Sequence, residues 1–219
     1  MGSRGWADPR LVAVLAAAFV ATFGLAVWLY LSGKPPGDGS AEACFARDMM
    51  VHHAQAVGMA EIVRDKTENE DVRILATDIA LTQQAQIGQM QGWLAVWGLP
   101  VAGTEPAMAW MGHPTEGRMP GMATPVEVNR LRNAPPEEAD KLFLRLMIPH
   151  HEAAIPMAEA VLEETDRPEV EQLAQAIATS QRAEVKVTQD LLRNMAEEAP
   201  ANEPADSSES MPGMDHGGH

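Results

Sequence analysis

The hydrophobic and polar positions of this chain divide it into one continuous apolar stretch followed by several amphipathic ones. Residues 11–31 include no charged side chain. A helix of that length, at about 1.5 Å rise per residue, crosses a hydrocarbon core of about 30 Å. The pattern therefore predicts a single transmembrane helix, with residues 1–33 as an N-terminal membrane anchor. A cleaved signal peptide is the alternative, although its apolar region usually spans only about 7–15 residues.

Charged residues around the apolar stretch indicate which way it crosses the membrane. Arg4 and Arg10 precede the stretch, whereas only Lys34 follows it closely. Because cytoplasmic flanks carry an excess of basic residues, this favours a cytoplasmic N-terminus. The sequence then predicts a single-pass cell-membrane protein whose C-terminal domain lies on the extracytoplasmic side.

Beyond the anchor, apolar residues recur with the spacing of helices that bury one face. Thr67 with Glu70, and Asp166 with Glu169, have the spacing of capping boxes at the start of a helix. The pattern predicts four long helices, at residues 40–66, 69–97, 136–165 and 168–197.

Two segments lack a helical apolar period. Residues 98–135 are rich in Gly, Pro and Met, and we expect this linker to run over the surface. Residues 198–219 are polar and acidic, which is the composition of a disordered tail. The sequence therefore predicts a helical domain at residues 34–197, followed by a tail that contains Met and His.

The first and third predicted helices repeat one sequence pattern. The segment FARDMMVHHAQAVGMAEIV begins at Phe45, and FLRLMIPHHEAAIPMAEAV begins 98 residues later at Phe143. The match continues without a gap through the following helix. Two duplicated hairpins, at residues 40–97 and 136–197, joined by a long connection are typical of an up-down four-helix bundle with a crossover. The predicted fold class is all-α.

Composition narrows the chemistry that this domain can perform. The chain has 16 Lys and Arg against 31 Asp and Glu, a net charge of −15, which repels nucleic acid and excludes it as a partner. Cys44 is the single cysteine, so an internal disulfide and a Cys-rich zinc or iron–sulfur site are excluded. We find no nucleophile–base pair, phosphate-binding loop or carboxylate pair, and predict no enzyme activity and no catalytic residue.

The 14 Met and 7 His residues are the remaining candidates for a functional site. At about 100° per residue, each first helix of a hairpin presents two thioethers and two imidazoles on one face. Methionine on such a face also serves as core packing, but buried imidazoles without partners would cost about 1–3 kcal/mol per group. The pattern favours metal ligation by these eight residues: Met49, His52, His53, Met59, Met147, His150, His151 and Met157.

The donor atoms indicate which metal would bind. Thioether sulfur prefers a soft ion such as Cu(I), imidazole suits copper in both common oxidation states, and neither donor selects Mg²⁺ or Ca²⁺. We therefore predict Cu(I) as the bound ion, with Ag(I) tolerated on the same grounds. A di-iron carboxylate centre would need Glu-x-x-His motifs, which the chain lacks.

Further candidate residues lie outside the two stripes. We expect Gln83 and Gln181, at equivalent positions of the repeat, to be solvated, and support of histidine nitrogens is the alternative. The sequence MPGM occurs in both the linker and the tail, and short Met and His tracts are a compositional signal of metal binding. The candidate ligands in these tracts are Met111, His113, Met119, Met122, Met211, Met214, His216 and His219.

The paired Met-x-x-His-His-x5-Met-Ala pattern, at Met49 and again at Met147, resembles the bacterial domain of unknown function 305 family. The resemblance covers roughly residues 40–197. It implies a ferritin-like helical fold and a periplasmic role in which Cu(I), and often Ag(I), is bound in copper resistance. It also implies ligand roles for the eight Met and His residues of the two stripes.

The leading hypothesis is a membrane-anchored, extracytoplasmic bundle that sequesters or delivers Cu(I) and so contributes to copper homeostasis. Its partners would be copper ions, the membrane and a copper-transfer protein. A metal-dependent redox enzyme in a ferritin-like bundle is one alternative. A helical interaction module, in which the soft Met surfaces bind a partner helix, is the other.

Overall fold

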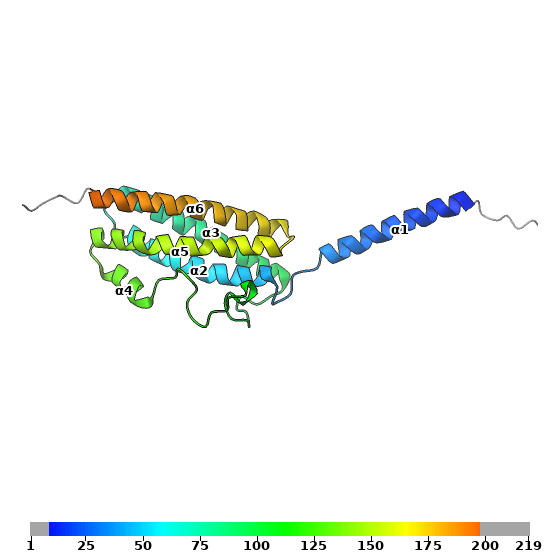
Figure 1. Cartoon of the computed structure of the whole chain (residues 1–219), viewed down its shortest axis with the longest axis horizontal. Helices are drawn as coiled ribbons and strands as arrows, with labels where there is room; N and C mark the ends of the chain where they lie inside the picture. The colour runs from blue at the N-terminus through cyan, green and yellow to red at the C-terminus, as the bar shows by residue number, and fades with distance from the viewer. Residues whose placement is uncertain (1–8, 198–219) are drawn as a thin grey trace, which may run out of the picture.

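The computed structural model of the chain describes residues 9–197, with the side chains of residues 10–27 and 33–197. These residues form six α-helices and a short 3-10 helix, and contain no strand beyond one isolated bridge between Ala107 and Thr115 (Figure 1). The predicted all-α fold is confirmed. The helices are α1 (Pro9–Ser32), α2 (Ala41–Arg64), α3 (Glu70–Trp97), η1 (Ala109–Met111), α4 (Pro125–Asn133), α5 (Pro136–Glu164) and α6 (Pro168–Glu197).

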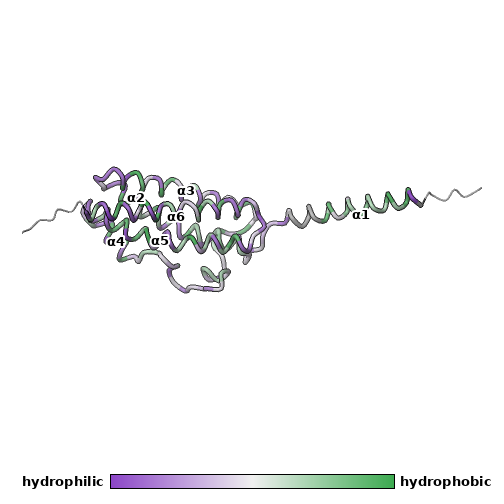
Figure 2. Tube along the Cα trace, turned by 45° about the horizontal axis from the view of Figure 1, so that its top comes forward, coloured by the Kyte–Doolittle hydropathy of each residue, from purple (hydrophilic) through white to green (hydrophobic). Residues whose placement is uncertain are grey.

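Helix α1 extends away from the other helices (Figure 1). Its window Arg10–Val27 has a mean hydropathy of 2.2, and none of that window is buried against the rest of the chain. Figure 2 shows this helix as a largely apolar rod beside the mixed surface of the other helices. Its length and composition are those of a membrane span, and a signal sequence shares them.

The four long helices α2, α3, α5 and α6 pack side by side as two hairpins (Figure 1). Helix α2 packs along α3, and α5 packs along α6, whereas the two hairpins meet chiefly through α2 and α5. Helices α2 and α5 run in opposite directions (Figure 1). The middle of α2 therefore lies against the middle of α5, and the first part of each helix lies against the last part of the other.

The helix starts follow local capping chemistry, with two corrections. The predicted capping box of Asp166 and Glu169 is wrong, because α6 begins at Pro168 and the backbone N–H before it, that of Arg167, donates to the Thr165 hydroxyl. The Ser40 side chain accepts a hydrogen bond from the backbone N–H of Ala43 and caps α2. The predicted capping box of Thr67 and Glu70 is wrong, because α3 begins after Asn69, whose side chain accepts from two backbone N–H groups of the first turn. The Thr67 hydroxyl instead donates to the carboxylate of Asp140 at 2.7 Å.

The contact between Thr67 and Asp140 has a counterpart in the other half of the domain. The Thr165 hydroxyl donates to the carboxylate of Glu42 at 3.1 Å, and both pairs are related by the same offset of 98 residues. Each pair ties the loop of one hairpin to the first turns of the other hairpin. The two hairpins are therefore joined in the same way at both ends of the α2–α5 interface.

The linker differs from the expected surface loop. It contains the 3-10 helix and α4, and α4 begins with a capping box in which Thr124 and Glu127 satisfy each other's backbone N–H groups. The Asp48 carboxylate accepts hydrogen bonds from the Met108 backbone N–H and the Trp110 indole N–H. The linker is thus held against α2, and several of its side chains are buried: Met108, Met119, Ala123 and Leu131.

Candidate metal centre

The two Met and His stripes meet at the interface between α2 and α5. The rings of His52 and His150, which occupy equivalent positions in the two repeats, have centroids 3.8 Å apart. The rings of His150 and His151 are 6.1 Å apart. All eight predicted stripe residues have no solvent-exposed surface: Met49, His52, His53, Met59, Met147, His150, His151 and Met157.

The methionines flank the imidazoles on both sides along the interface. Because α2 and α5 are antiparallel, Met49 packs in the same buried cluster as Met157. Met59 packs in a second cluster with Met147. Two pairs of thioethers, one residue from each repeat in every pair, therefore lie to either side of the histidines.

Side chains from the outer helices bind two of the histidines at the Nε2 atom. The His53 Nε2 lies 2.8 Å from the Gln86 Oε1 of α3, and the His151 Nε2 lies 2.6 Å from the Glu184 Oε2 of α6. Amide and carboxylate oxygens accept hydrogen bonds, so these partners assign the proton of each ring to Nε2. The Nδ1 atom of each ring then carries a free lone pair.

The other two histidines also present unpaired nitrogens. The His52 Nε2 faces the backbone oxygen of Pro120 at 3.4 Å. The Nδ1 atoms of all four histidines are buried without a hydrogen-bond partner, and so is the Nε2 of His150. Leaving a buried polar group unpaired costs about 1–3 kcal/mol. These unpaired nitrogens, and not the hydrogen-bonded Nε2 atoms of His53 and His151, are the atoms available to a ligand.

Burial keeps the imidazoles of His52, His53 and His150 neutral. Desolvation is the largest cause that lowers the pKa of His52 from 6.5 to about 4, and it lowers the pKa of His53 to about 3. Desolvation also lowers the pKa of His150 well below 6.5, and the neighbouring imidazoles add to this effect. A metal binds the neutral form of histidine, so at neutral pH no proton has to leave these three rings first.

The structure corrects the expectation for the two glutamines. Gln83 and Gln181 are almost fully buried rather than solvated, and neither makes a hydrogen bond to a histidine among the described side chains. Gln86 and Glu184, one helical turn further along, are the residues that contact the rings. The sequence carried a signal for this pair, because both are polar and they occupy equivalent positions of the repeat.

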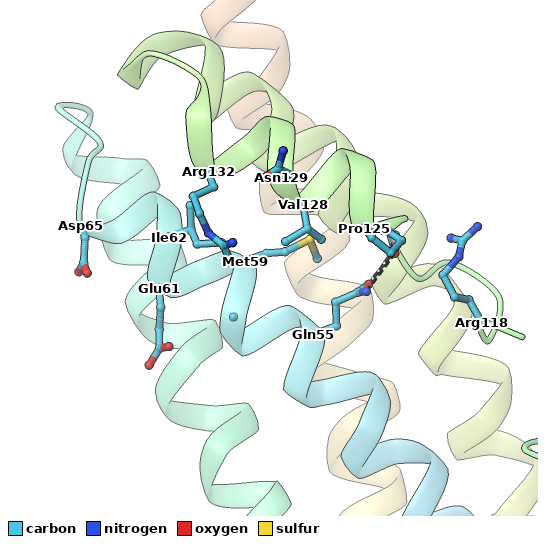
Figure 3. Close-up of a pocket in the computed structure, with 12 residues that line it drawn as sticks. Gln55, Met59, Glu61, Ile62, Asp65, Arg118, Pro125, Val128, Asn129 and Arg132 are labelled. Atoms are coloured by element: carbon cyan, nitrogen blue, oxygen red, sulfur yellow. Dashed lines mark hydrogen bonds between the residues drawn. The ribbon is translucent and has the colours of Figure 1, made fainter.

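Residues 119–123 of the linker cover the histidines where α2 faces α5. Two hydrogen bonds fasten this segment to α2: the Gln55 amide donates to the Ala123 oxygen at 3.0 Å, and its Oε1 accepts from the Ala123 N–H at 2.7 Å. Figure 3 shows Gln55 pointing from α2 toward this segment. The Pro120 oxygen above His52 belongs to the same segment.

Gly121 seats the same segment on α5. A Cβ atom at Gly121 would lie 2.3 Å from the backbone oxygen of Pro149 and 2.6 Å from the Cβ of Ala153. Its φ of +74° also lies in the left-handed region that favours glycine. The glycine of this MPGM motif is therefore required for the linker to approach the third helix of the bundle.

The candidate ligands of the linker are placed unequally. Met119 is buried in the cluster that contains Met49 and Met157, and Met111 and Met122 pack against that cluster while partly buried. His113 is exposed. Sequence reasoning missed three further methionines of this cluster, Met50, Met90 and Met108. The candidates of the tail lie outside the described residues: Met211, Met214, His216 and His219.

A surface groove of about 830 Å³ reaches toward the centre between α2 and α4. Met59 forms part of its floor, and Figure 3 shows the Met59 side chain directed toward α4. Arg118 and Arg132 line the groove together with Glu61 and Asp65. The groove therefore brings the protein surface close to one stripe thioether, although Met59 itself has no exposed surface.

The described residues contain no group of three His, Cys, Asp or Glu side chains placed to hold one metal ion. Methionine sulfur is the other donor that the α2–α5 interface offers, and it is present on both sides of the imidazoles. The donor atoms at this interface are thus imidazole nitrogen together with thioether sulfur, which suit soft, singly charged ions.

The fold and the site define a helical domain in which two repeated hairpins bring imidazoles and thioethers together at their interface. The chain belongs to the DUF305 family, a domain of unknown function whose family model matches residues 42–192. The resemblance seen in the sequence is confirmed. A comparison with the curated proteins finds no match.

Solved structures of the same family share the fold. A DUF305 protein from Streptomyces coelicolor is 44% identical, with a TM-score of 0.68 over 72% of this chain and 94% of that one. A DUF305 fragment from Deinococcus radiodurans is 38% identical, with a TM-score of 0.61 over 73% of this chain and 99% of that one.

A third similar structure carries a metal. CopM in its Cu(II)-bound form is 33% identical, with a TM-score of 0.56 over 71% of this chain and 97% of that one. Other CopM structures, 28% identical with TM-scores of 0.52, hold the protein in Cu(I)-bound and Ag-bound forms. This chain is therefore similar in structure to a protein that binds copper and silver.

Proposed function

We propose that this chain is a membrane-anchored protein that binds Cu(I) and Ag(I) between α2 and α5 and stores or passes on the ion. Residues 1–33 would anchor it, residues 34–197 would form the metal-binding domain, and residues 198–219 would be a tail with additional ligands. The domain would lie on the extracytoplasmic side of the cell membrane. Copper ions, the membrane and a copper-transfer protein would be its partners.

One observation carries this proposal. Four imidazoles from the two repeats are fully buried, the rings of His52 and His150 are in contact, and the Nδ1 atoms of all four have no hydrogen-bond partner. A domain that only needed a packed core would lose about 1–3 kcal/mol for each such group. A bound ion would accept those lone pairs and remove the penalty.

The surrounding sulfur atoms favour a soft ion over other metals. Met49 with Met157, and Met59 with Met147, supply thioethers on both sides of the rings. Thioethers carry no proton and form no disulfides, so such a site stays functional in an oxidising compartment. The metal-bound structures of CopM support the same choice of ions.

The linker and the tail would supply secondary ligands. Met119 and Met122 lie beside the thioethers of the first cluster, within the segment that covers the histidines. The tail repeats the MPGM sequence of this segment at residues 211–214. We include both tracts as sites that capture the ion before it enters the bundle. No catalytic step is part of the proposal.

An anaerobic Cu(I) titration against a chromophoric chelator tests this function on the full chain in detergent. To isolate the bundle, the tail ligands are first replaced, and the titration is repeated with His52→Gln and His150→Gln combined. We expect Cu(I) affinity to fall at least tenfold, since two ligating nitrogens are lost. Ag(I) should follow the same order.

His113→Gln is the matched control, because His113 is an exposed histidine of the same chain. It should leave the affinity of the bundle unchanged. Equal affinities for the double variant, the control and the parent chain would exclude the α2–α5 interface as the copper site.

A further inference from the structure

The two halves of the histidine cluster differ in one residue that contacts a ring. His53 and His151 occupy equivalent positions of the repeat, and each is hydrogen-bonded at Nε2 by the residue 33 positions later. In the first half this residue is Gln86, and in the second half it is Glu184. The repeat therefore holds one neutral and one carboxylate partner in otherwise equivalent places.

The geometry of the two contacts is similar while their charge is not. The Gln86 amide oxygen lies 2.8 Å from its ring, and the Glu184 carboxylate lies 2.6 Å from its ring. Glu184 is 22% exposed and His151 is fully buried. The negative charge is thus in contact with the ring but reaches solvent only at its outer side, so water screens it incompletely.

A carboxylate behind a ligating imidazole changes what the metal experiences. It fixes the ring orientation, makes the opposite nitrogen a stronger donor, and places a negative charge near the ion. The attraction grows with the charge on the metal, so it is larger for Cu(II) than for Cu(I) or Ag(I). An amide in the same place orients the ring without adding a charge.

We infer that Glu184 is a positioning residue that shifts the metal preference of the α2–α5 site toward Cu(II), whereas Gln86 leaves its half suited to Cu(I) and Ag(I). The inference rests on the proposed function, because it assigns an oxidation-state preference to the same site. It makes the two repeats chemically unequal, although their ligand residues are the same. The site then accepts copper in either oxidation state without a change of ligands.

The first test gives both halves the same hydrogen-bond partner. Glu184→Gln gives the second half the pairing that the first half already has, so size and hydrogen bonding are preserved. In the full chain, with the tail ligands replaced, we expect Cu(II) affinity to fall about tenfold while Ag(I) affinity stays within about threefold. The midpoint potential of the bound copper couple should rise by about 59 mV, which is that tenfold change for one electron.

A double variant that moves the carboxylate to the first half tests whether the Cu(II) affinity is restored. Gln86→Glu combined with Glu184→Gln moves the carboxylate to the other half, and it should restore most of the Cu(II) affinity and return the potential toward its starting value. Thermal melting of each metal-free variant establishes that the fold is intact.

The possible outcomes separate the two claims. An equal loss of Cu(II) and Ag(I) affinity in Glu184→Gln, or no change in either, would overturn the role of Glu184. If the parent chain binds neither ion in the bundle, the proposed function fails instead, whatever the variants do.

Discussion

At the scale of single residues, the distinctive feature of this protein is the presence of four histidines in its core. Three of the rings have a partner at Nε2, from the linker for His52 and from the outer helices for His53 and His151, whereas neither nitrogen of His150 has one. The Nδ1 atom of every ring is buried without a hydrogen-bond partner. Burial lowers the pKa of His52, His53 and His150, so these rings are neutral donors at physiological pH. The unpaired imidazole nitrogens are thus free to bind a metal, and their burial lowers the free energy of unfolding of the metal-free protein.

That cost predicts a pH dependence of the metal-free protein. The histidines of the unfolded chain titrate near pH 6.5, whereas folded His52 titrates near pH 4, so the unfolded state binds more protons between these values. The free energy of unfolding should therefore fall as the pH is lowered through this window. The slope is up to about 1.4 kcal/mol per pH unit for each such histidine. Thermal or urea unfolding between pH 7 and 5 measures it.

His52→Gln is the control, because it removes one titrating group. It should reduce the slope of the unfolding free energy against pH by the contribution of about one histidine. Burial raises the pKa of Asp48 and Asp140, and these groups act in the opposite direction, but they are present in both proteins. A metal-free parent chain whose stability is constant or rises on acidification through pH 5 would contradict the account.

At the residue scale, the sequence located the Met and His residues that are buried together, but not the hydrogen-bond partners of the histidines. The eight Met and His positions could be found because the repeat shows the same unusual residues twice at one offset. Gln86 and Glu184 are ordinary helix residues in the sequence, and only the packing of α3 and α6 places them against the rings. The burial of a single residue depends on the neighbouring helices, which the sequence does not place. Gln83 and Gln181 were therefore expected in solvent.

At the scale of elements, the linker is the part of the domain that covers the site. Its segment 119–123 is fastened to α2 by Gln55 and seated on α5 through Gly121. This arrangement closes the exposed side of the α2–α5 interface above His52. Pro120 of this segment is the linker residue that contacts a histidine among the described residues.

Gly121→Ala should detach this segment. The new Cβ atom would lie 2.3 Å from the Pro149 oxygen, and the backbone conformation of Gly121 is unfavourable for alanine. We expect a loss of about 1–3 kcal/mol in the free energy of unfolding, as for other overpacked positions. Urea unfolding of the metal-free chain measures this difference.

Gly117→Ala is the matched control in the same linker, because a Cβ atom at Gly117 has no neighbour within 4 Å. Its stability should stay within about 0.5 kcal/mol of the parent. If both substitutions have the same effect, Gly121 does not hold the segment against α5.

The long helices were largely predictable because their signals are local. Apolar spacing placed each of them within three residues of the observed ends. The capping residue of α3 was misassigned because Thr67 and Asn69 are both good capping residues, and a tertiary contact with Asp140 engages Thr67. Helix α4 was missed because it is short, although Thr124 and Glu127 do carry a capping-box pattern.

At the scale of the whole molecule, the described residues include an apolar helix, α1, and two helical hairpins that carry the histidines. Helix α1 is apolar and unburied, as a helix in contact with lipid would be. The two hairpins are joined along α2 and α5, so His52 and His150, which are equivalent in the repeat, meet where the two copies pack together. The sequence predicted the duplication, but it left open whether the two stripes meet, since that depends on how the hairpins dock.

X-ray absorption at the copper edge tests the central claim most directly. The sample is the full chain loaded anaerobically with one equivalent of Cu(I), with Met211, Met214, His216 and His219 replaced so that only the domain offers Met and His ligands. We predict both nitrogen and sulfur atoms bound to the copper, and loss of the nitrogen when four histidines are replaced by Gln: His52, His53, His150 and His151. A shell of oxygen alone, or a nitrogen and sulfur shell that survives this replacement, would contradict it.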